Sequence, residues 1–344
     1  MAILAAIFGC AGLRLTDEER RFFARVEPFG FILFARNVGE PGQVRSLTGE
    51  LRDAVGRKDA PVLMDQEGGR VQRLRPPQWR AAPPAARFGE LAAADLDAAL
   101  EAVTLNARLI GAELADLYID TVCAPVLDLR HSGANDAIGD RSFSADPNIV
   151  AALGQAACKG CRQSGVAPVI KHMPGHGRGM VDSHQALPVV EAPLAELDAT
   201  DFRPFIALAD EPLGMTGHLL IRAVDPENPA TTSARVIREV IRGRIGFQGV
   251  LMTDDLSMGA LAGSIGERAR AALAAGCDLA LHCNGRMEEM LAVASAVSPA
   301  SSATTARWEA ARERAAGAAT AAKPLEPAIL ARRLSDLLER TLSA

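Results

Sequence analysis

Basic charge, cysteine and long apolar segments are all scarce in this sequence. Its 344 residues include 37 Lys and Arg against 42 Asp and Glu, which gives a net charge of −5. Proteins that bind duplex nucleic acid usually carry a basic surplus, so the sequence predicts no nucleic-acid partner. Six cysteines are far too few for a disulfide scaffold in a chain of this length, and they favour a reducing compartment.

The apolar segment at the N-terminus is too short to span a membrane. The run MAILAAIFGCAGLRL falls short of the roughly 18–20 apolar residues that a span needs, and no Lys or Arg precedes it as in a signal peptide. We expect it to form a first buried strand. No later segment is long and uncharged enough to cross a bilayer, so we expect a cytoplasmic protein without membrane contact.

The cysteine spacing does not indicate metal or redox chemistry. Cys158 and Cys161 form a C-x-x-C pair, but the pair lies in a stretch with a helical pattern, and no second pair completes a zinc site. Thiols commonly pack as small hydrophobic groups, and we interpret this pair in that way.

Short apolar runs alternate with helical patterns along the whole chain. After the N-terminal run, apolar runs occupy 30–35, 61–64, 122–127, 166–170, 187–190, 213–215, 249–252 and 278–281. They are apolar on both faces, which is typical of strands in a parallel sheet that is covered on both sides.

The helical patterns begin with a capping box at Thr16 and Glu19, which opens a helix toward Val26. Further helices are predicted at 43–55, 96–117, 147–163, 194–209, 233–244, 265–275 and 286–297. Strands and helices alternate about eight times, which predicts an α/β protein with a single (β/α)8, TIM-type barrel; an open doubly wound sheet is the alternative. No linker interrupts the pattern, so we expect one domain over 1–344 that ends in helices at about 301–344.

Polar residues collect directly after the apolar runs. In a barrel the carboxyl ends of the strands share one rim, where catalytic groups lie, so these side chains are expected to meet at one mouth. Each one taken alone is equally well interpreted as a strand-end cap or a solvated charge. The residues are Asp65, Asp128, Lys171, His172, His218, Asp254 and His282.

The segment 171–184, KHMPGHGRGMVDSH, contains three of the six histidines. Its glycines permit left-handed turns. Asp182 and His184 are two residues apart, so in an extended segment their side chains point to the same side. A carboxylate beside an imidazole raises the pKa of the imidazole and fixes its tautomer, which is how a general acid–base is built.

Two other interpretations of this segment remain open. His172, His176 and His184 with Asp182 form a candidate metal site, although H-x-x-x-H presents two ligands on one face only in a helix, and Pro174 opposes a helix here. A purely structural polar loop is the other. We favour acid–base chemistry without a metal.

A second segment, 250–259, places two carboxylates at the end of a strand. Asp254 follows the strand directly, where a rigid carboxylate can act as a nucleophile or stabiliser at a glycosidic carbon. Asp255 competes for this role, but because side chains alternate, only one of the two is expected to face the barrel axis. A helix N-cap is the alternative for either residue.

The segments 64–73 and 138–143 combine acidic residues, glycines and arginines. Asp accepts hydrogen bonds from neighbouring hydroxyls and Arg donates in a fixed fork, so these groups suit a polyhydroxylated ligand. Each segment taken alone could equally be a surface loop.

Together, the segments MDQEGGRVQR, IGDRSF, KHMPGHG followed by DSH, and LMTDDLSMGAL resemble the signatures of the bacterial β-N-acetylhexosaminidases of glycoside hydrolase family 3. The resemblance extends from about the first strand to the last and leaves only the terminal helices uncovered. Met173 stands where the family commonly has Phe. The length is similar to that of the short, single-domain Gram-negative type.

The resemblance implies an exo-acting, retaining, two-step hydrolysis without metal or cofactor. Asp254 would be the nucleophile, and His184 the acid–base supported by Asp182. The substrate would be terminal N-acetylglucosamine on 1,6-anhydro-muramyl fragments, with or without peptide, in cell-wall recycling. We expect a monomer. The residues implied to hold the sugar are Asp65, Arg73, Arg141, Lys171 and His172.

Other functions stay open. A histidine acid is neutral once it has given up its proton, so anionic acceptors such as phosphate are repelled less, and a phosphorylase or transglycosylase on the same site is one alternative. A metal-dependent TIM-barrel hydrolase and a non-catalytic sugar-binding barrel are others. A nicotinamide enzyme is disfavoured because no G-x-G-x-x-G follows an early strand. We also expect the loop 174–184 to move and carry His184 over the sugar.

Overall fold

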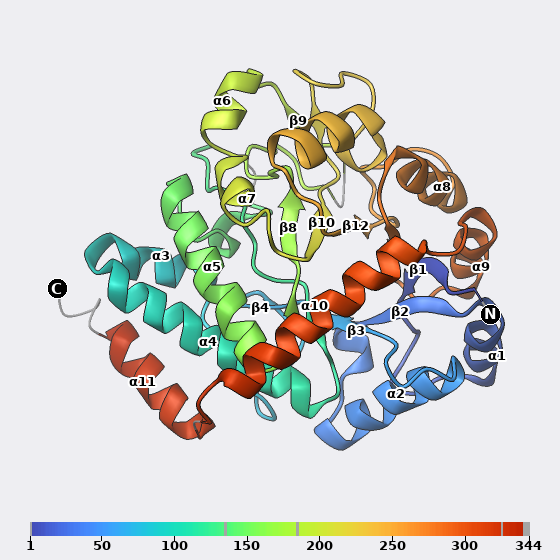
Figure 1. The fold of residues 1–344 in the computed structure, drawn as a ribbon, viewed down its shortest axis with the longest axis horizontal. Coiled ribbons are helices and arrows are strands. Elements are labelled where there is room, and N and C mark those ends of the chain that lie inside the picture. The colour runs from blue at the N-terminus through green and yellow to red at the C-terminus, as the bar shows by residue number, and fades with distance from the viewer. Residues whose placement is uncertain (1, 134–135, 184–185, 325, 340–344) are drawn as a thin grey trace.

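The computed structural model describes residues 2–133, 136–183, 186–324 and 326–339 (Figure 1). His184, the predicted acid–base, lies outside these residues.

Nine strands form one sheet in which every neighbouring pair is parallel. The sheet has the order β7-β6-β3-β2-β1-β13-β12-β10-β8, and its two end strands are separated in the chain only by Val169, so the sheet closes on itself. Counted as one strand, β7 and β8 bring the total to eight, which confirms the predicted barrel. The strands are β1 (Leu4–Phe8), β2 (Pro28–Leu33), β3 (Val62–Met64), β6 (Thr121–Val122), β7 (Ala167–Pro168), β8 (Ile170–Met173), β10 (Leu213–Thr216), β12 (Val250–Asp255) and β13 (Leu279–His282).

Helices surround the barrel (Figure 1). The predicted capping box is present, since the Thr16 hydroxyl accepts from the Glu19 N–H at 3.1 Å and the Glu19 carboxylate accepts from the Thr16 N–H at 2.9 Å. No helix among the described residues has both the length and the apolar character needed to cross a membrane. The helices are α1 (Asp17–Val26), α2 (Pro41–Ala54), α3 (Ala85–Ala94), α4 (Leu96–Asp116), α5 (Pro147–Gln163), α6 (Leu194–Ala199), α7 (Arg203–Ala207), the π-helix η4 (Val236–Arg244), α8 (Ile265–Ala275), α9 (Met287–Ala296), α10 (Ser302–Ala321) and α11 (Pro327–Glu339).

The apolar core has two layers, one inside the barrel and one between the strands and the helices. Successive side chains of a strand enter different layers, because they point to opposite faces of the sheet. Thus Val250 and Met252 of β12 lie inside, whereas Leu251 lies under the helices. Helix α10 covers the amino end of the barrel, where Trp308 packs edge-on against Phe29 with ring centroids 5.2 Å apart.

Two predicted elements are wrong. The run 187–190 is not a barrel strand: β9 (Val189–Val190) pairs with β11 (Leu220–Ile221) in a separate small sheet, because β8 and β10 pair directly and leave no room between them. The predicted helix 194–209 is broken into α6 and α7, because Pro204 has no N–H with which to continue the hydrogen bonding of α6.

A hairpin that was not predicted from the sequence lies at the mouth of the barrel. Strands β4 (Gln66–Gly68) and β5 (Val71–Gln72) are antiparallel and follow β3 immediately. The buried Gln66 side chain holds the hairpin closed, since it accepts from the backbone N–H groups of Arg73 and Leu74 and donates to the Leu74 carbonyl. This fold brings the acidic residues of the segment to the barrel rim.

Candidate active site

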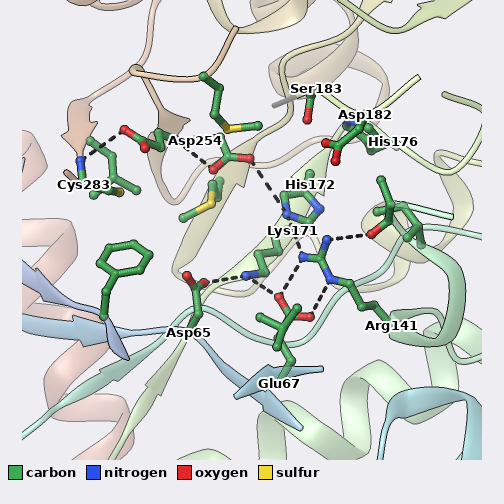
Figure 2. Close-up of a pocket in the computed structure, with 18 of the residues that line it drawn as sticks. Asp65, Glu67, Arg141, Lys171, His172, His176, Asp182, Ser183, Asp254 and Cys283 are labelled. Carbon is green, nitrogen blue, oxygen red and sulfur yellow. Dashed lines mark hydrogen bonds and ion pairs between the residues drawn. The ribbon is translucent and has the colours of Figure 1, made fainter. Parts of the chain in front are cut away.

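A cavity of about 320 Å³ opens at the carboxyl ends of the barrel strands (Figure 2). Four of the seven predicted strand-end residues line it, and they come from three separate parts of the chain. Asp65 follows β3, Lys171 and His172 belong to β8, and Asp254 belongs to β12.

The alternation of side chains explains why Asp65 and Asp254 reach this cavity and His218 and His282 do not, whereas the adjacent Lys171 and His172 both line it. Leu63 and Met252 lie inside the barrel, so Asp65 and Asp254, each two residues further along, also point inward. His282 of β13 and His218, just after β10, occupy the alternate positions, whose side chains face away from the barrel interior, so they point away from the cavity. The His218 ring bonds to the Thr231 hydroxyl and the Asp255 carbonyl, and the His282 ring bonds to Glu289.

Asp65 and Lys171 form the first part of a buried charge network (Figure 2). The Lys171 ammonium donates to Asp65 at 2.8 Å and to Glu67 at 2.7 Å, and Arg73 donates to the second oxygen of Asp65 at 2.9 Å. Burial opposes ionisation of Asp65, but Lys171 and Arg73 outweigh it and hold the pKa of Asp65 well below its usual range. Asp65 therefore remains an anionic acceptor for hydroxyl groups.

Glu67 and Arg141 complete this network. The Arg141 guanidinium makes two hydrogen bonds of 2.8 Å to the Glu67 carboxylate. Despite burial, Arg141 and Lys171 lower the pKa of Glu67 to about 2. Arg141 was among the residues predicted to hold the sugar, but Glu67 was not. Its position in the sequence could have indicated it, because Glu67 is two residues beyond Asp65. In addition, buried cations such as Arg141 and Lys171 require anionic partners.

Arg73 packs against an aromatic ring. Its guanidinium lies 5.0 Å from the centroid of the Phe34 ring, and Arg36 lies 5.2 Å from the same centroid. Phe34 follows β2 and lines the cavity. Cation–π contacts of this kind restrict the orientation of Arg73, which donates to Asp65 through one guanidinium nitrogen.

His172 lies between two carboxylates. Its Nδ1 is 2.7 Å from Asp128, and its Nε2 is 4.0 Å from Asp254 and 3.5 Å from an Arg141 nitrogen. The Asp128 side chain is fully buried behind His172. Asp128 was predicted to lie at the rim but was not included among the sugar-binding residues.

The two neighbouring aspartates of β12 differ in their bonding. Asp254 accepts the Asp255 N–H at 2.8 Å and directs its other oxygen toward His172. Burial would raise the pKa of Asp254, but the nearby imidazoles, above all His172, hold it below its ordinary value. Asp255 is bound instead to the Ser257 hydroxyl and to backbone N–H groups of Ser257 and Cys283. Asp254 is thus the ionised carboxylate that is less occupied by structural contacts.

The glycine-rich segment 174–183 forms one wall of the cavity, where Asp182 and Ser183 lie (Figure 2). Gly177 packs so tightly that an added Cβ would come within 2.0 Å of the Leu129 carbonyl oxygen. Arg178 ties the segment to α6 and its C-terminal flank through Glu196 and Asp201, both at 2.7 Å. His184 follows this wall directly in sequence but lies outside the described residues.

His176 lines the same cavity, and sequence reasoning considered it only as a candidate metal ligand. It is 5% exposed, and neither ring nitrogen has a hydrogen-bond partner among the residues that the structure describes. Burial lowers the pKa of His176, so the ring is neutral near pH 7.

Among all the residues that the structure describes, no group of three or more His, Cys, Asp or Glu is arranged to hold a metal ion. Cys158 and Cys161 are buried free thiols.

Residues 6–317 match the glycosyl hydrolase family 3 N terminal domain. The chain belongs to glycosyl hydrolase family 3. The family that the four sequence segments resemble is therefore confirmed, and the barrel-rim cavity is the candidate active site of a family 3 glycoside hydrolase.

Relatives of this family 3 hydrolase carry more specific names. Beta-hexosaminidases of Bordetella avium and Pseudomonas aeruginosa are 39% and 41% identical, over 80% and 82% of this chain and 79% and 83% of theirs. NagZ from Neisseria gonorrhoeae in complex with N-trifluoroacetyl-D-glucosamine superposes with a TM-score of 0.85 at 32% identity, covering 98% of this chain and 99% of that one. The same enzyme in complex with zinc ion superposes with a TM-score of 0.85 at 30% identity, with the same coverage.

Proposed function

We propose that this family 3 hydrolase is an exo-acting β-N-acetylglucosaminidase that works by a retaining, two-step mechanism. The observation that carries the proposal is the ionised Asp254 carboxylate in the cavity, in which Asp182 of the glycine-rich wall also lies. The names of the beta-hexosaminidase relatives and the amino-sugar bound by the Neisseria enzyme support an amino-sugar substrate.

The cavity volume supports removal of one terminal sugar at a time. At about 320 Å³ it lies at the small end of the range of ligand pockets, which is about 300–1,000 Å³. We assign recognition of this sugar to Asp65, Arg73, Arg141, Lys171 and His172. Asp65 would accept hydroxyl hydrogen bonds, and the paired cations would hold the carboxylates rigid, so that little reorganisation accompanies binding.

In the first step, an Asp254 oxygen attacks the anomeric carbon and forms a glycosyl ester while the bond to the leaving oxygen breaks. Protonated His184 gives its proton to that oxygen, with Asp182 orienting the imidazole. In the second step, neutral His184 takes a proton from water, the water oxygen bonds to the anomeric carbon, and Asp254 leaves as a carboxylate. Two inversions give net retention.

The cellular role that we propose follows the resemblance of the sequence to the short Gram-negative enzymes. The substrate would be N-acetylglucosaminyl-1,6-anhydro-muramyl fragments, with or without peptide, and the enzyme would act as a cytoplasmic, single-domain monomer in cell-wall recycling, without cofactor or metal. Transfer to phosphate or to a second sugar on the same site is the alternative, and sugar 1-phosphate formed in phosphate buffer would favour it.

A covalent trap tests the mechanism. A 5-fluoro N-acetylglucosaminyl donor keeps the acetamido group, and its fluorine slows both steps, so the intermediate accumulates. Peptide mapping should find the sugar on Asp254, and NMR of the first product formed should show the β anomer. A label on another residue, or an α-configured first product, would refute the proposal. Turnover without any labelled peptide would indicate that the acetamido group, and not the enzyme, is the nucleophile.

A further inference from the structure

The Asp128 carboxylate joins two parts of the site that lie on different segments. Oδ2 contacts Nδ1 of the His172 ring at 2.7 Å, and Oδ1 accepts the backbone N–H of His176 at 2.7 Å. His172 is one of the proposed sugar-binding residues, and His176 lies at the start of the glycine-rich wall. The Asp128 side chain is fully buried, so water does not compete for these contacts.

The bonding of Asp128 determines which nitrogen of His172 carries a proton. Burial disfavours the ionised carboxyl, but His172 and the hydrogen bonds that Asp128 accepts hold its pKa below the usual range, so Asp128 is a carboxylate that only accepts. Nδ1 of His172 must therefore carry a proton. Nε2 is left to face the cavity, 3.5 Å from an Arg141 nitrogen and 4.0 Å from Asp254.

This tautomer is the one that suits the surroundings of Nε2. Arg141 presents only N–H donors, so a hydrogen bond between it and a neutral His172 requires a lone pair on Nε2. Arg141 also binds Glu67, which binds Lys171, so the orientation of His172 is coupled to the whole sugar-binding network.

We propose that Asp128 is a positioning residue of the proposed active site, which fixes His172 in the Nδ1–H tautomer so that Nε2 faces the sugar, Arg141 and Asp254. The proposal rests on the function proposed above for His172 and Asp254. A carboxylate behind an imidazole serves the same purpose in other sites where a histidine must act through one particular nitrogen.

Asp128→Asn separates this role from simple structural support. The His176 N–H can only donate, so it keeps the amide oxygen on its own side, and the amide NH2 group must then face Nδ1 of His172. Nδ1 becomes an acceptor, and the proton moves to Nε2, where it meets the Arg141 donors. If Asp128 only anchored the glycine-rich wall, the nearly isosteric Asn would preserve function and Asp128→Ala would be the damaging change.

The experiment has two readouts. Long-range 1H–15N correlation spectra of histidine-labelled protein distinguish the two tautomers, and with six histidines in the chain, His172→Gln assigns the signal. We expect Nδ1–H in the wild type, Nε2–H in Asp128→Asn, and kcat/KM on an aryl N-acetylglucosaminide about 10- to 100-fold lower in that variant. The matched control is Asp120→Asn, because Asp120 precedes β6 on the same segment, is partly buried and paired with Arg52, and lies at the far end of the barrel.

Three results would overturn the proposal: an Nε2–H signal in the wild type, an unchanged tautomer in Asp128→Asn, or a kcat/KM for Asp128→Asn within twofold of the wild type. Equal losses in Asp128→Asn and Asp120→Asn would also do so, because they would indicate general destabilisation. The spectra do not depend on turnover, so failure of the trap at Asp254 and failure of this proposal are separate results.

Discussion

Glu67→Gln removes one negative charge from the network while it keeps the shape of the side chain. The Glu67 carboxylate accepts two hydrogen bonds of 2.8 Å from Arg141 and faces Lys171 at 2.7 Å. An amide keeps only one acceptor oxygen, and its NH2 group must face one of these donors. The Glu67 and Lys171 side chains are 7% and 3% exposed, so water cannot replace the lost contacts.

Two estimates of the cost agree. Removing one partner of a buried pair costs about 3–5 kcal/mol. Independently, Glu67 has a pKa of about 2 in place of an ordinary 4.5, and at 1.36 kcal/mol per pKa unit this corresponds to about 3 kcal/mol. With an unfolding entropy of about 2.1 cal/mol/K per residue, the 344-residue chain should lose about 4–7 °C in Tm.

The pH dependence follows from the direction of the shift. The pKa of Glu67 is lower in the folded state, so its stabilisation is fully present above pH 4.5 and is lost as the pH falls toward 2. The difference in Tm between wild type and Glu67→Gln should therefore be constant from pH 7 to about pH 5 and then shrink. Differential scanning fluorimetry at a series of pH values measures it.

A matched control comes from the surface. Glu101 also makes a bidentate pair, with Arg333, but both side chains are more than 40% exposed, so Glu101→Gln should change the unfolding free energy by less than about 1 kcal/mol. Equal Tm values for wild type and Glu67→Gln at pH 7 would refute this reasoning, and so would a difference that stays constant down to pH 3.

Further predictions concern the proposed chemistry. Asp254→Ala should remove nearly all hydrolysis but leave N-acetylglucosamine binding within a few-fold in calorimetry; substantial residual turnover would argue against a nucleophilic Asp254. His184→Ala should reduce kcat/KM on natural disaccharides at least tenfold more than on a dinitrophenyl glycoside, whose leaving group scarcely needs an acid; equal losses would contradict the acid role. EDTA should leave the rate on a chromogenic glycoside unchanged, and a loss that zinc restores would favour a metal-dependent hydrolase.

Local patterns in the sequence predicted most of the fold. The alternation of apolar runs and helices predicted the barrel, because strand and helix periods are properties of short segments. The same patterns failed where long-range pairing decides the outcome. Within the run 187–190, only Val189 and Val190 form a strand, and it stays outside the barrel because β8 and β10 pair with each other.

The sequence also identified which residues end the strands, but not which of them face the cavity. Barrel strands are apolar on both faces, so the pattern does not show which parity points inward, and only the closed sheet places Asp65 and Asp254 inside and His218 and His282 outside. The buried partners Glu67 and Asp128 could not be identified from the pattern either. Their importance comes from charges that are distant in sequence, on Arg141, Lys171 and His172, and a charge acquires a buried partner only when the chain has folded.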